Sequence, residues 1–348
     1  MSRQFPQSIA NRPLQMTTVA AVIPSYRVTR HILEVIGRIG PECQRIYVVD
    51  DCCPDGSGDF VEKNCTDPRV TVIRNPQNLG VGGAVMAGMR AAMAEGAMVI
   101  AKIDGDGQMP PEWLPGLVRP ILAGHADYVK GNRFYDLTNI RRMPAVRIFG
   151  NAMLSLMAKL STGYWDVFDP TNGFVAIHAK VAGKLPLEKI SARYFFETDM
   201  LFRLNTIRAV VVDVPMDAVY GDEVSNLRIS RTALEFLGKH IRNFHKRIFY
   251  NYFLRDMSIA SLELLFGAPL LVGGLTYGIY HWVASAKTGS ATPFGTIMLS
   301  ALSVLVGFQL LLSFLNYDIA SVPRRPIHHF LPELDEAPDS GGRADQDS

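Results

Sequence analysis

The chain has 348 residues, of which 48% are hydrophobic and 20% are charged, and its formal net charge is +2. This is the composition of a folded protein of about two domains rather than of a disordered chain. The low net charge argues against a dedicated nucleic-acid binder. The four cysteines, at 43, 52, 53 and 65, form no C-x-x-C pair and have no histidines at zinc spacing, which disfavours a zinc site or a disulfide framework and fits a reducing, cytosolic location.

The N-terminal part predicts a folded α/β domain after a short lead-in. Residues 1–16 have no apolar core, so we expect a flexible N-terminus and no secretory signal. Residues 17–215 alternate between β-branched apolar runs and helical stretches, which predicts a mostly parallel sheet covered by helices, and we expect this domain to extend over residues 17–231. The expected strands are 18–24, 45–51, 69–75, 97–104, 126–132, 173–178 and 209–215.

A glycine-rich run, "GVGGAVMAGMRAAMAEG", lies between the third and fourth expected strands and predicts a helix. It does not form G-x-G-x-x-G, because position 85 is Val, and it follows an Asn-rich turn rather than a strand. A dinucleotide-dependent hydride transfer is therefore disfavoured. Small residues at the helix start instead allow close packing against a ligand or a neighbouring strand.

Polar residues follow four of the expected strands, at the carboxyl edge where open parallel sheets bind ligands. They are Tyr26, Asp50, Asp51, Asn75, Asn78, Asp104 and Asp106. Asp104 and Asp106 are separated by one glycine, and their charges repel by about 1 kcal/mol at contact distance in water and more where water is excluded. Such a pair suits a hard divalent cation that also binds substrate phosphates, with solvated turn residues as the alternative reading.

The C-terminal third changes character. Residues 264–284 and 294–315 carry no formal charge and are long enough to cross a bilayer as helices, so we expect a transmembrane hairpin over 258–318. Two buried helices of a soluble core are disfavoured because neither segment has a polar face. Basic residues flank the hairpin and its loop carries only Lys287, which places the catalytic domain and both termini in the cytoplasm.

The segments on either side of the hairpin predict two further regions. Residues 232–257 mix aromatic and aliphatic residues with basic ones and predict juxtamembrane amphipathic helices on the membrane surface. The alternative is a solvated helix packed on the catalytic domain. Residues 319–348 are expected to form a disordered cytoplasmic tail.

Five motifs occur in an order that resembles a known family. They are "VIPSYR", "VVDDCCPDGSGD", "NPQNLGVGGAVMAGMRAA", "KIDGDGQMPPEWL" and "KGNRF". The set resembles inverting glycosyltransferases of family 2, which have the GT-A fold. Together with the hairpin, it resembles the polyprenol-phosphate glycosyltransferases, the group that contains dolichol-phosphate mannose synthases and undecaprenyl-phosphate glucosyltransferases. The resemblance covers roughly residues 18 to 316.

The resemblance implies a donor site at the carboxyl edge. The residues lining the nucleotide pocket would be Pro24, Tyr26, Val49 and Asp51. The diphosphate and its Mg²⁺ or Mn²⁺ would be held by Asp104, Gly105 and Asp106, with Gln108 as a further neighbour of the metal.

The resemblance also implies an acceptor-phosphate site at Arg133, Arg147 and Asn151, where the family often has Ser at the last position. Arg147 and Asn151 are four residues apart among apolar residues, so one helix face can bind a phosphate while its apolar side chains meet lipid. The remaining arginines of this region, Arg141 and Arg142, are expected to be surface charges or to contact anionic headgroups.

The motif "RYFFETDML" matches the place where related enzymes carry an acidic catalytic pair. A lipid phosphate is already ionised near neutral pH, so a general base is unnecessary. We therefore expect Asp199 to act with Asp106 and Arg133 through positioning or electrostatics, and Glu197 to a smaller extent. The competing reading is an acid that stabilises a helix N-terminus.

The sequence departs from the mannose synthases after the last strand. In those enzymes an Arg and a Lys bind the donor diphosphate, and the nearest equivalents in this sequence are Ala218 and Asn226. Arg228 and Arg231 are candidate substitutes. The sequence therefore does not identify the sugar or the nucleobase of the donor.

We therefore expect inverting, metal-dependent transfer of one hexose from a UDP- or GDP-sugar to undecaprenyl or dolichyl phosphate. The expected location is the cytoplasmic face of the inner membrane, with membrane lipids and another copy of the chain as further partners. Two alternatives stay open. One is a different lipid or glycan acceptor, although a processive synthase is disfavoured because the chain lacks Q-x-x-R-W. The other is a non-catalytic scaffold that binds a nucleotide sugar.

Overall fold

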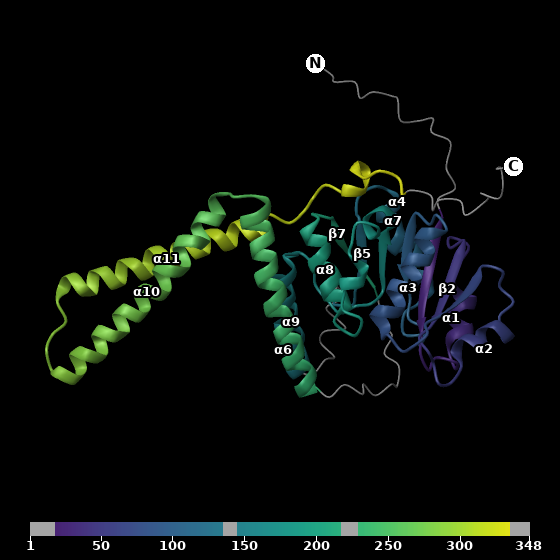
Figure 1. The fold of residues 1–348 in the computed structure, drawn as a ribbon, viewed down its shortest axis with the longest axis horizontal. Coiled ribbons are helices and arrows are strands. Elements are labelled where there is room, and N and C mark those ends of the chain that lie inside the picture. The colour runs from purple at the N-terminus through teal and green to yellow at the C-terminus, as the bar shows by residue number, and fades with distance from the viewer. Residues whose placement is uncertain (1–17, 135–144, 217–228, 335–348) are drawn as a thin grey trace, which may run out of the picture.

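The computed structural model describes residues 18–134, 145–216 and 229–334, and in this part of the chain seven strands form one sheet. The spatial order is β3-β2-β1-β4-β6-β5-β7 (Figure 1). All seven expected strands are present. Their bounds are β1 Val19–Ser25, β2 Arg45–Asp50, β3 Val70–Arg74, β4 Val99–Lys102, β5 Tyr128–Asn132, β6 Val175–His178 and β7 Val211–Pro215.

The prediction of a mostly parallel sheet is confirmed, with one antiparallel strand. β6 runs against both β4 and β5, and its first residue, Val175, lies opposite Lys102 and Lys130. The chain therefore returns to the carboxyl edge after α6 (Ala145–Thr162) and before β6 begins. This return places residues 163–174 beside the ends of β4 and β5.

Helices cover both faces of the sheet. One face is packed by α3 (Val81–Ala94), α7 (Ala179–Ala182), the short 3₁₀ turn η2 (Leu187–Lys189) and α8 (Phe196–Thr206). The other face is packed by α1 (Ile32–Arg38), α2 (Ser57–Asn64) and α4 (Leu114–Leu122), and the short 3₁₀ turn η1 (Pro111–Trp113) contacts α1 and α4. Strands buried on both sides explain why their sequences are continuous apolar runs.

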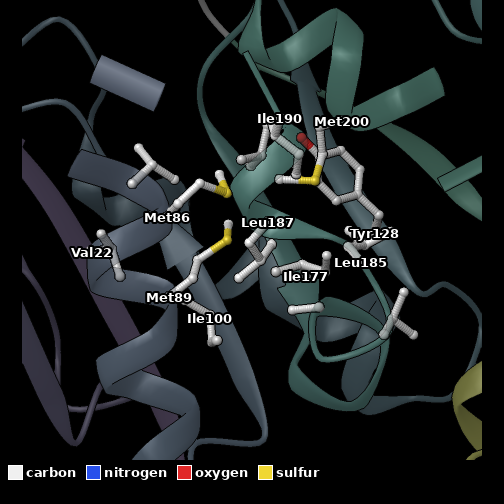
Figure 2. Close-up of a cluster of buried hydrophobic side chains, with 14 of the residues drawn as sticks. Val22, Met86, Met89, Ile100, Tyr128, Ile177, Leu185, Leu187, Ile190 and Met200 are labelled. Carbon is white, nitrogen blue, oxygen red and sulfur yellow. The ribbon is translucent and has the colours of Figure 1, made fainter. Parts of the chain in front are cut away.

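The larger core cluster fixes α3 and α8 over the centre of the sheet. Met86 and Met89 of α3 point toward Leu187 and Ile190 in Figure 2, and Val22 of β1 lies on the other side of the two methionines. Unbranched methionine side chains fill the irregular space between two helices and a sheet. This packing holds the first turn of α8 in a fixed position.

The glycines at the start of α3 pack against backbone. A Cβ at Gly82 would lie 2.5 Å from the carbonyl oxygen of Ser191, and the amide of Gly83 donates to the carbonyl of Ala192 at 3.1 Å. The loop before α8 lies directly against these glycines and leaves no room for larger side chains. Protein carbonyls therefore meet this helix N-terminus, which agrees with rejecting a dinucleotide site.

The segment before the hairpin forms one long helix rather than the pair of amphipathic helices that we expected. α9 (Ile229–Phe249) continues directly into a π-helical run, η3 (Tyr250–Arg255). α9 packs on α6 and α8, where His240, Asn243 and Arg247 are buried, and it exposes Leu234 and Ile241 on another face. One face of α9 therefore packs on the α/β domain, and another face keeps apolar side chains exposed.

Two long apolar helices stand away from the domain as a hairpin (Figure 1). α10 (Ile259–Thr288) and α11 (Phe294–Ala320) are both long and apolar enough to cross a membrane, and they extend beyond the predicted spans. Glycines 267, 274 and 307 lie where the two helices approach each other closely. Such small residues are typical of helix pairs in membranes.

The expected disordered tail is wrong for residues 319–334. After α11 the chain returns to the α/β domain, forms a 3₁₀ turn, η4 (Ile327–Phe330), and packs Ile327, Leu331 and Leu334 against the larger core cluster. Buried Asp127 accepts hydrogen bonds from the amides of Ile327 and His328 at 2.9 and 3.0 Å. Residues 1–16 and 335–348, which we expected to be flexible, lie outside the described residues.

Candidate active site at the carboxyl edge of the sheet

A buried lysine lies beside the Asp-Gly-Asp motif. Lys102, the last residue of β4, is 1% exposed, and its Nζ lies 2.7 Å from Oδ1 of the half-buried Asp104. Its ammonium also lies 5.6 Å from the centre of the Phe196 ring. The protein thus supplies part of the positive charge that the two neighbouring carboxylates require.

Asp104 and Asp106 are arranged as a turn at the partly exposed edge. Oδ1 of Asp106 accepts a hydrogen bond from the backbone amide of Gln108 at 3.0 Å. Gly107, between Asp106 and Gln108, has a φ of +80°, a conformation that favours glycine. Gly105 is buried against Ile23 and Val28.

The donor set fits a metal that takes most of its ligands from the substrate. Within the described residues, no group of three or more His, Cys, Asp or Glu side chains is placed to hold a metal. Mg²⁺ is usually bound by one or two carboxylates together with water and substrate phosphates. Two adjacent carboxylates at an accessible edge meet that requirement, so Asp104 and Asp106 are the residues that would hold the ion.

The acidic pair on α8 divides between two environments. Glu197 is buried near Lys102: a Cβ placed at Gly173 would be 3.2 Å from Oε1 of Glu197 and would also touch the Lys102 Nζ. Burial raises the pKa of Glu197 to about 8, and the neighbouring positive charge of Lys102 opposes part of that rise.

Asp199, two residues after Glu197, contributes to the packing of α8. It is 1% exposed and accepts the amide of Ser191 at 2.9 Å and the side-chain amide of Asn243 on α9 at 3.1 Å. Arg203 lies 3.6 Å away. The carboxyl group near the Asp104 edge is therefore Glu197, to which the sequence had assigned the smaller role.

Arg133 follows β5 and forms a bidentate ion pair with buried Asp169. Its Nε and Nη2 donate to the two carboxylate oxygens at 2.8 and 2.9 Å. Burial alone would raise the pKa of Asp169, but the hydrogen bonds and charge of Arg133 hold it below its ordinary value. Because Asp169 accepts from two donors of the planar guanidinium at once, the pair fixes the plane of the Arg133 side chain.

A second buried lysine supports the loop that carries Asp169. Lys130 is 1% exposed, and its ammonium donates to the carbonyls of Phe168, at 3.1 Å, and of Asp169. Burial lowers the pKa of Lys130. Because Lys130 and Lys102 both lie opposite Val175, the two ammonium-bearing side chains leave the sheet on the same face.

The predicted nucleotide residues do not all reach the surface. Tyr26 is exposed just after β1, whereas Pro24 and Val49 are buried partners on adjacent strands. Asp51 is also buried, and it accepts hydrogen bonds from Asn75 and from the amides of residues 79 and 80, at 2.7 to 2.9 Å. Asp51 therefore holds the turn before α3, and Tyr26 is the member that presents an open surface.

The structure describes only part of the predicted acceptor-phosphate site. Asn151 is half-buried on α6, and Arg147 lies one turn earlier on that helix, but its side chain is outside the described ones. Phe149 and Met153 of the same helix are exposed. The same limit applies to the side chain of Arg231, and residues 141, 142, 218, 226 and 228 lie wholly outside the described residues.

Three charged residues of this edge were missed by the sequence prediction: Lys102, Lys130 and Asp169. The signal was present for the lysines, since each interrupts an otherwise apolar strand, in "VIAKID" and "DYVKGN". A buried lysine is costly without a partner and therefore indicates a nearby carboxylate or carbonyl group. Asp169 begins the motif "DPTNGF", which also matches the family, but nothing in that motif indicated its partner Arg133, which is 36 residues away in sequence.

Comparison with known proteins gives the family. The family model described as Glycosyl transferase family 2 matches residues 21–185. The undecaprenyl-phosphate mannosyltransferase of Micrococcus luteus is 32% identical over 206 residues, which cover 58% of this chain and 83% of that protein. The chain belongs to glycosyltransferase family 2.

Two further likenesses agree with the membership of family 2. The polyprenol monophosphomannose synthase of Mycolicibacterium smegmatis is 30% identical over 210 residues, covering 59% of this chain and 78% of that protein. Glucosyl-3-phosphoglycerate synthase from Mycobacterium tuberculosis, solved with uridine diphosphate, superposes with a TM-score of 0.51 at 18% identity, covering 67% of this chain and 80% of that chain. The structural likeness confirms the expected GT-A fold of this family 2 enzyme.

Proposed function

We propose that this family 2 glycosyltransferase transfers one hexose, with inversion, from a UDP- or GDP-sugar to a polyprenyl phosphate at a membrane surface. The proposal rests on one combination of features. Asp104 and Asp106 lie at the carboxyl edge of the sheet, and both ends of an apolar hairpin attach to the same α/β domain. Two relatives named for sugar transfer to polyprenyl phosphates support the acceptor class.

The chemistry requires positioning more than proton transfer. An acceptor phosphate oxygen attacks the anomeric carbon in line, the bond from that carbon to the donor diphosphate breaks, and the nucleoside diphosphate leaves. The attacking phosphate is already ionised, so no protein base is needed. Aligning two phosphates and the sugar in one geometry supplies much of the rate enhancement.

The residues of the edge divide this work. Asp104 and Asp106 would hold a divalent cation, which when bound neutralises charge on the diphosphate. Arg133, oriented by Asp169, supplies a fixed positive charge for the acceptor phosphate, and Asn151 with Arg147 on α6 would complete that site. Asp199 keeps α8 and α9 together and so holds the carboxylate-bearing first turn of α8 in place.

The orientation follows from the way the hairpin is anchored. The chain leaves the domain through α9 and continues into α10, and after α11 it packs back onto the domain. The two segments that flank the hairpin therefore lie on one side of any membrane that the hairpin crosses. The flanking basic residues assign that side to the cytoplasm. A cysteine introduced at Ser290 should react with an impermeant maleimide added outside intact cells, and one at Arg324 should not; the reverse pattern would contradict this orientation.

The decisive experiment is a donor panel with the purified full-length protein and undecaprenyl phosphate, with the products identified by mass. We expect one sugar to be added, and we expect Asp106→Ala to lower the rate by about 100-fold or more, as does removal of a charge-stabilising group in other enzymes. Asp59→Ala, which removes an exposed carboxylate on α2, is the matched control. Unchanged transfer by Asp106→Ala with the metal chelated would overturn the proposal.

The same assay separates the alternatives. A glycolipid that survives mild acid would indicate an acceptor without a phosphate linkage. Metal-dependent binding of a nucleotide sugar, with no product on any lipid or glycan, would indicate a non-catalytic scaffold.

A further inference from the structure

A polar cavity of about 120 Å³ lies where the hairpin joins the α/β domain. We call it the junction cavity. Its lining comes from three places: Arg208 before β7, Asn251 and Arg255 of η3, and Ser258 and Ser321 at the membrane-proximal ends of α10 and α11. The carboxylate of Asp256 also borders it.

Two arginines face this cavity without a carboxylate partner. Among the described residues, no carboxylate lies within 4.0 Å of the guanidinium of Arg208 or Arg255. Arg208 is half-buried and Arg255 is exposed. Burial and the charge of Arg208 both lower the pKa of Arg255, so the two guanidiniums lie close enough to repel each other. Two like charges held together in this way form a site for an anion, and the cavity keeps an excess of one positive charge after Asp256 is counted.

The local backbone is also unusual. Arg208 has a φ of +63°, which is uncommon for a residue with a side chain, and η3 is a π-helical run. Strained residues and π-helical turns occur often at functional sites. In addition, the side-chain oxygen of Asn251 is buried without a hydrogen-bond partner. This oxygen is a hydrogen-bond acceptor, so only a hydroxyl or another donor group of a ligand could satisfy it, and a phosphate oxygen could not.

The junction cavity is separate from the candidate active site. Arg208 precedes β7 and therefore lies at the amino edge of the sheet, whereas Asp104 and Arg133 lie at the carboxyl edge. α9 runs between these regions for 21 residues, or about 30 Å at the rise of an α-helix. Ser258 and Ser321 mark the level at which both hairpin helices leave the expected bilayer, where lipid headgroups lie.

We propose that the junction cavity binds the phosphate group of a membrane-lipid headgroup through Arg208 and Arg255. A guanidinium matches the geometry of phosphate oxygens with paired N–H donors, and two of them can bind one phosphate from both sides. The inference rests on that part of the proposed function in which the hairpin crosses a membrane, and it is independent of sugar transfer.

The test is binding of phosphatidylglycerol to the full-length protein in detergent, measured by native mass spectrometry. We expect Arg208→Gln/Arg255→Gln to weaken binding by roughly tenfold or more, the range expected for lost hydrogen bonds to charged groups. The matched control is Arg324→Gln/Arg325→Gln, which removes the same charge from exposed positions after α11 and should leave binding within about twofold. Equal binding by both double variants would overturn the proposal.

Two further arms identify the source of the phosphate. Diacylglycerol, which lacks phosphate, should not compete; if it binds as well as phosphatidylglycerol, the cavity does not recognise phosphate. Inorganic phosphate should compete only weakly, and equal competition would assign the cavity to a free anion instead of a lipid. Arg255→Lys, which keeps the charge, should retain part of the binding and serves as the test if the double variant does not fold.

Sugar transfer measured on the same samples separates the two proposals. Lipid binding that depends on the two arginines in a protein with no transferase activity would support the cavity and refute the transfer. Normal transfer with binding unaffected by the double variant would refute the cavity alone.

Discussion

Lys102 supplies a buried positive charge beside Asp104 at the carboxyl edge of the sheet. An ammonium with 1% exposure is unfavourable unless it is paired, and here Asp104 lies at 2.7 Å and the Phe196 ring at 5.6 Å. The same ammonium lies close to Glu197. One buried cation thus connects a residue that would bind the metal with the first turn of α8.

The pKa of Glu197 leads to a pH-dependent prediction. Its value of about 8 lies above the ordinary 4.5, so the folded protein binds more protons than the unfolded chain between these pH values. Folding stability from this group is therefore complete below about pH 4.5 and declines as the pH rises to about 8. We expect Glu197→Gln to gain stability relative to the wild type across this interval.

The measurement is the midpoint of thermal unfolding for both proteins from pH 4 to pH 9. The difference between them should grow in favour of the variant and become constant above about pH 8. Glu188→Gln, at an exposed position of η2, is the control and should give a flat difference. A flat difference for Glu197→Gln would contradict the assignment.

At the scale of elements, one carboxylate joins the hairpin to the domain. Asp318 of α11 is 2% exposed and accepts hydrogen bonds from Arg247 at 2.6 and 3.0 Å and from the Tyr252 hydroxyl at 2.5 Å. The indole of Trp165 donates to it at 2.8 Å, and Arg247 also donates to the carbonyl of Leu160 at the end of α6. The hairpin, α9 and α6, which carries two of the predicted acceptor residues, therefore meet at Asp318.

Breaking this junction should be costly. Asp318→Asn leaves the Arg247 guanidinium buried without its counterion, and we expect a loss of about 3–5 kcal/mol of stability. Thermal unfolding in detergent would measure the loss, and faster hydrogen exchange in α6 would locate it. Asp166→Asn, an exposed change beside Trp165, is the control. A loss no larger than that of the control would show that the junction contributes little.

At the scale of the whole molecule, the chain closes on itself. The segment after α11 returns to the α/β domain, where the ring of His328 lies 2.7 Å from Asp127 and stacks on His178 at 4.4 Å. The hairpin is therefore held at both ends, and its tilt against the domain is restricted. Under the proposed function, a lipid acceptor would therefore meet the domain in a limited range of orientations.

This closure can be tested with two neighbouring histidines. His328→Ala removes a partner of fully buried Asp127 and should cost about 1–3 kcal/mol of stability. His329→Ala, at the exposed neighbouring position, should cost much less. Limited proteolysis after residue 321 should become faster only in the first variant. Similar behaviour of the two would mean that the returning segment is not held by Asp127.

The sequence by itself determined the features that depend on local residue patterns, which are the strands of the sheet and the helices of the hairpin. β-branched apolar runs predicted every strand of the sheet, because period and side-chain shape act within a few residues, and the two uncharged stretches predicted the hairpin helices by length alone. The glycine between Asp104 and Asp106 likewise kept both carboxylates at one strand end. The family resemblance added the roles, which stay proposals.

Only the tertiary structure decided which charges meet. Glu197 lies near Lys102 while Asp199 faces α9, β6 enters the sheet antiparallel, and His328 binds Asp127 across 201 positions of sequence. Each depends on contacts between segments far apart in the chain, and no local periodicity encodes them. Burial then sets the energy of every such contact, which is why the expected tail became part of the core and a strand lysine became part of the candidate site.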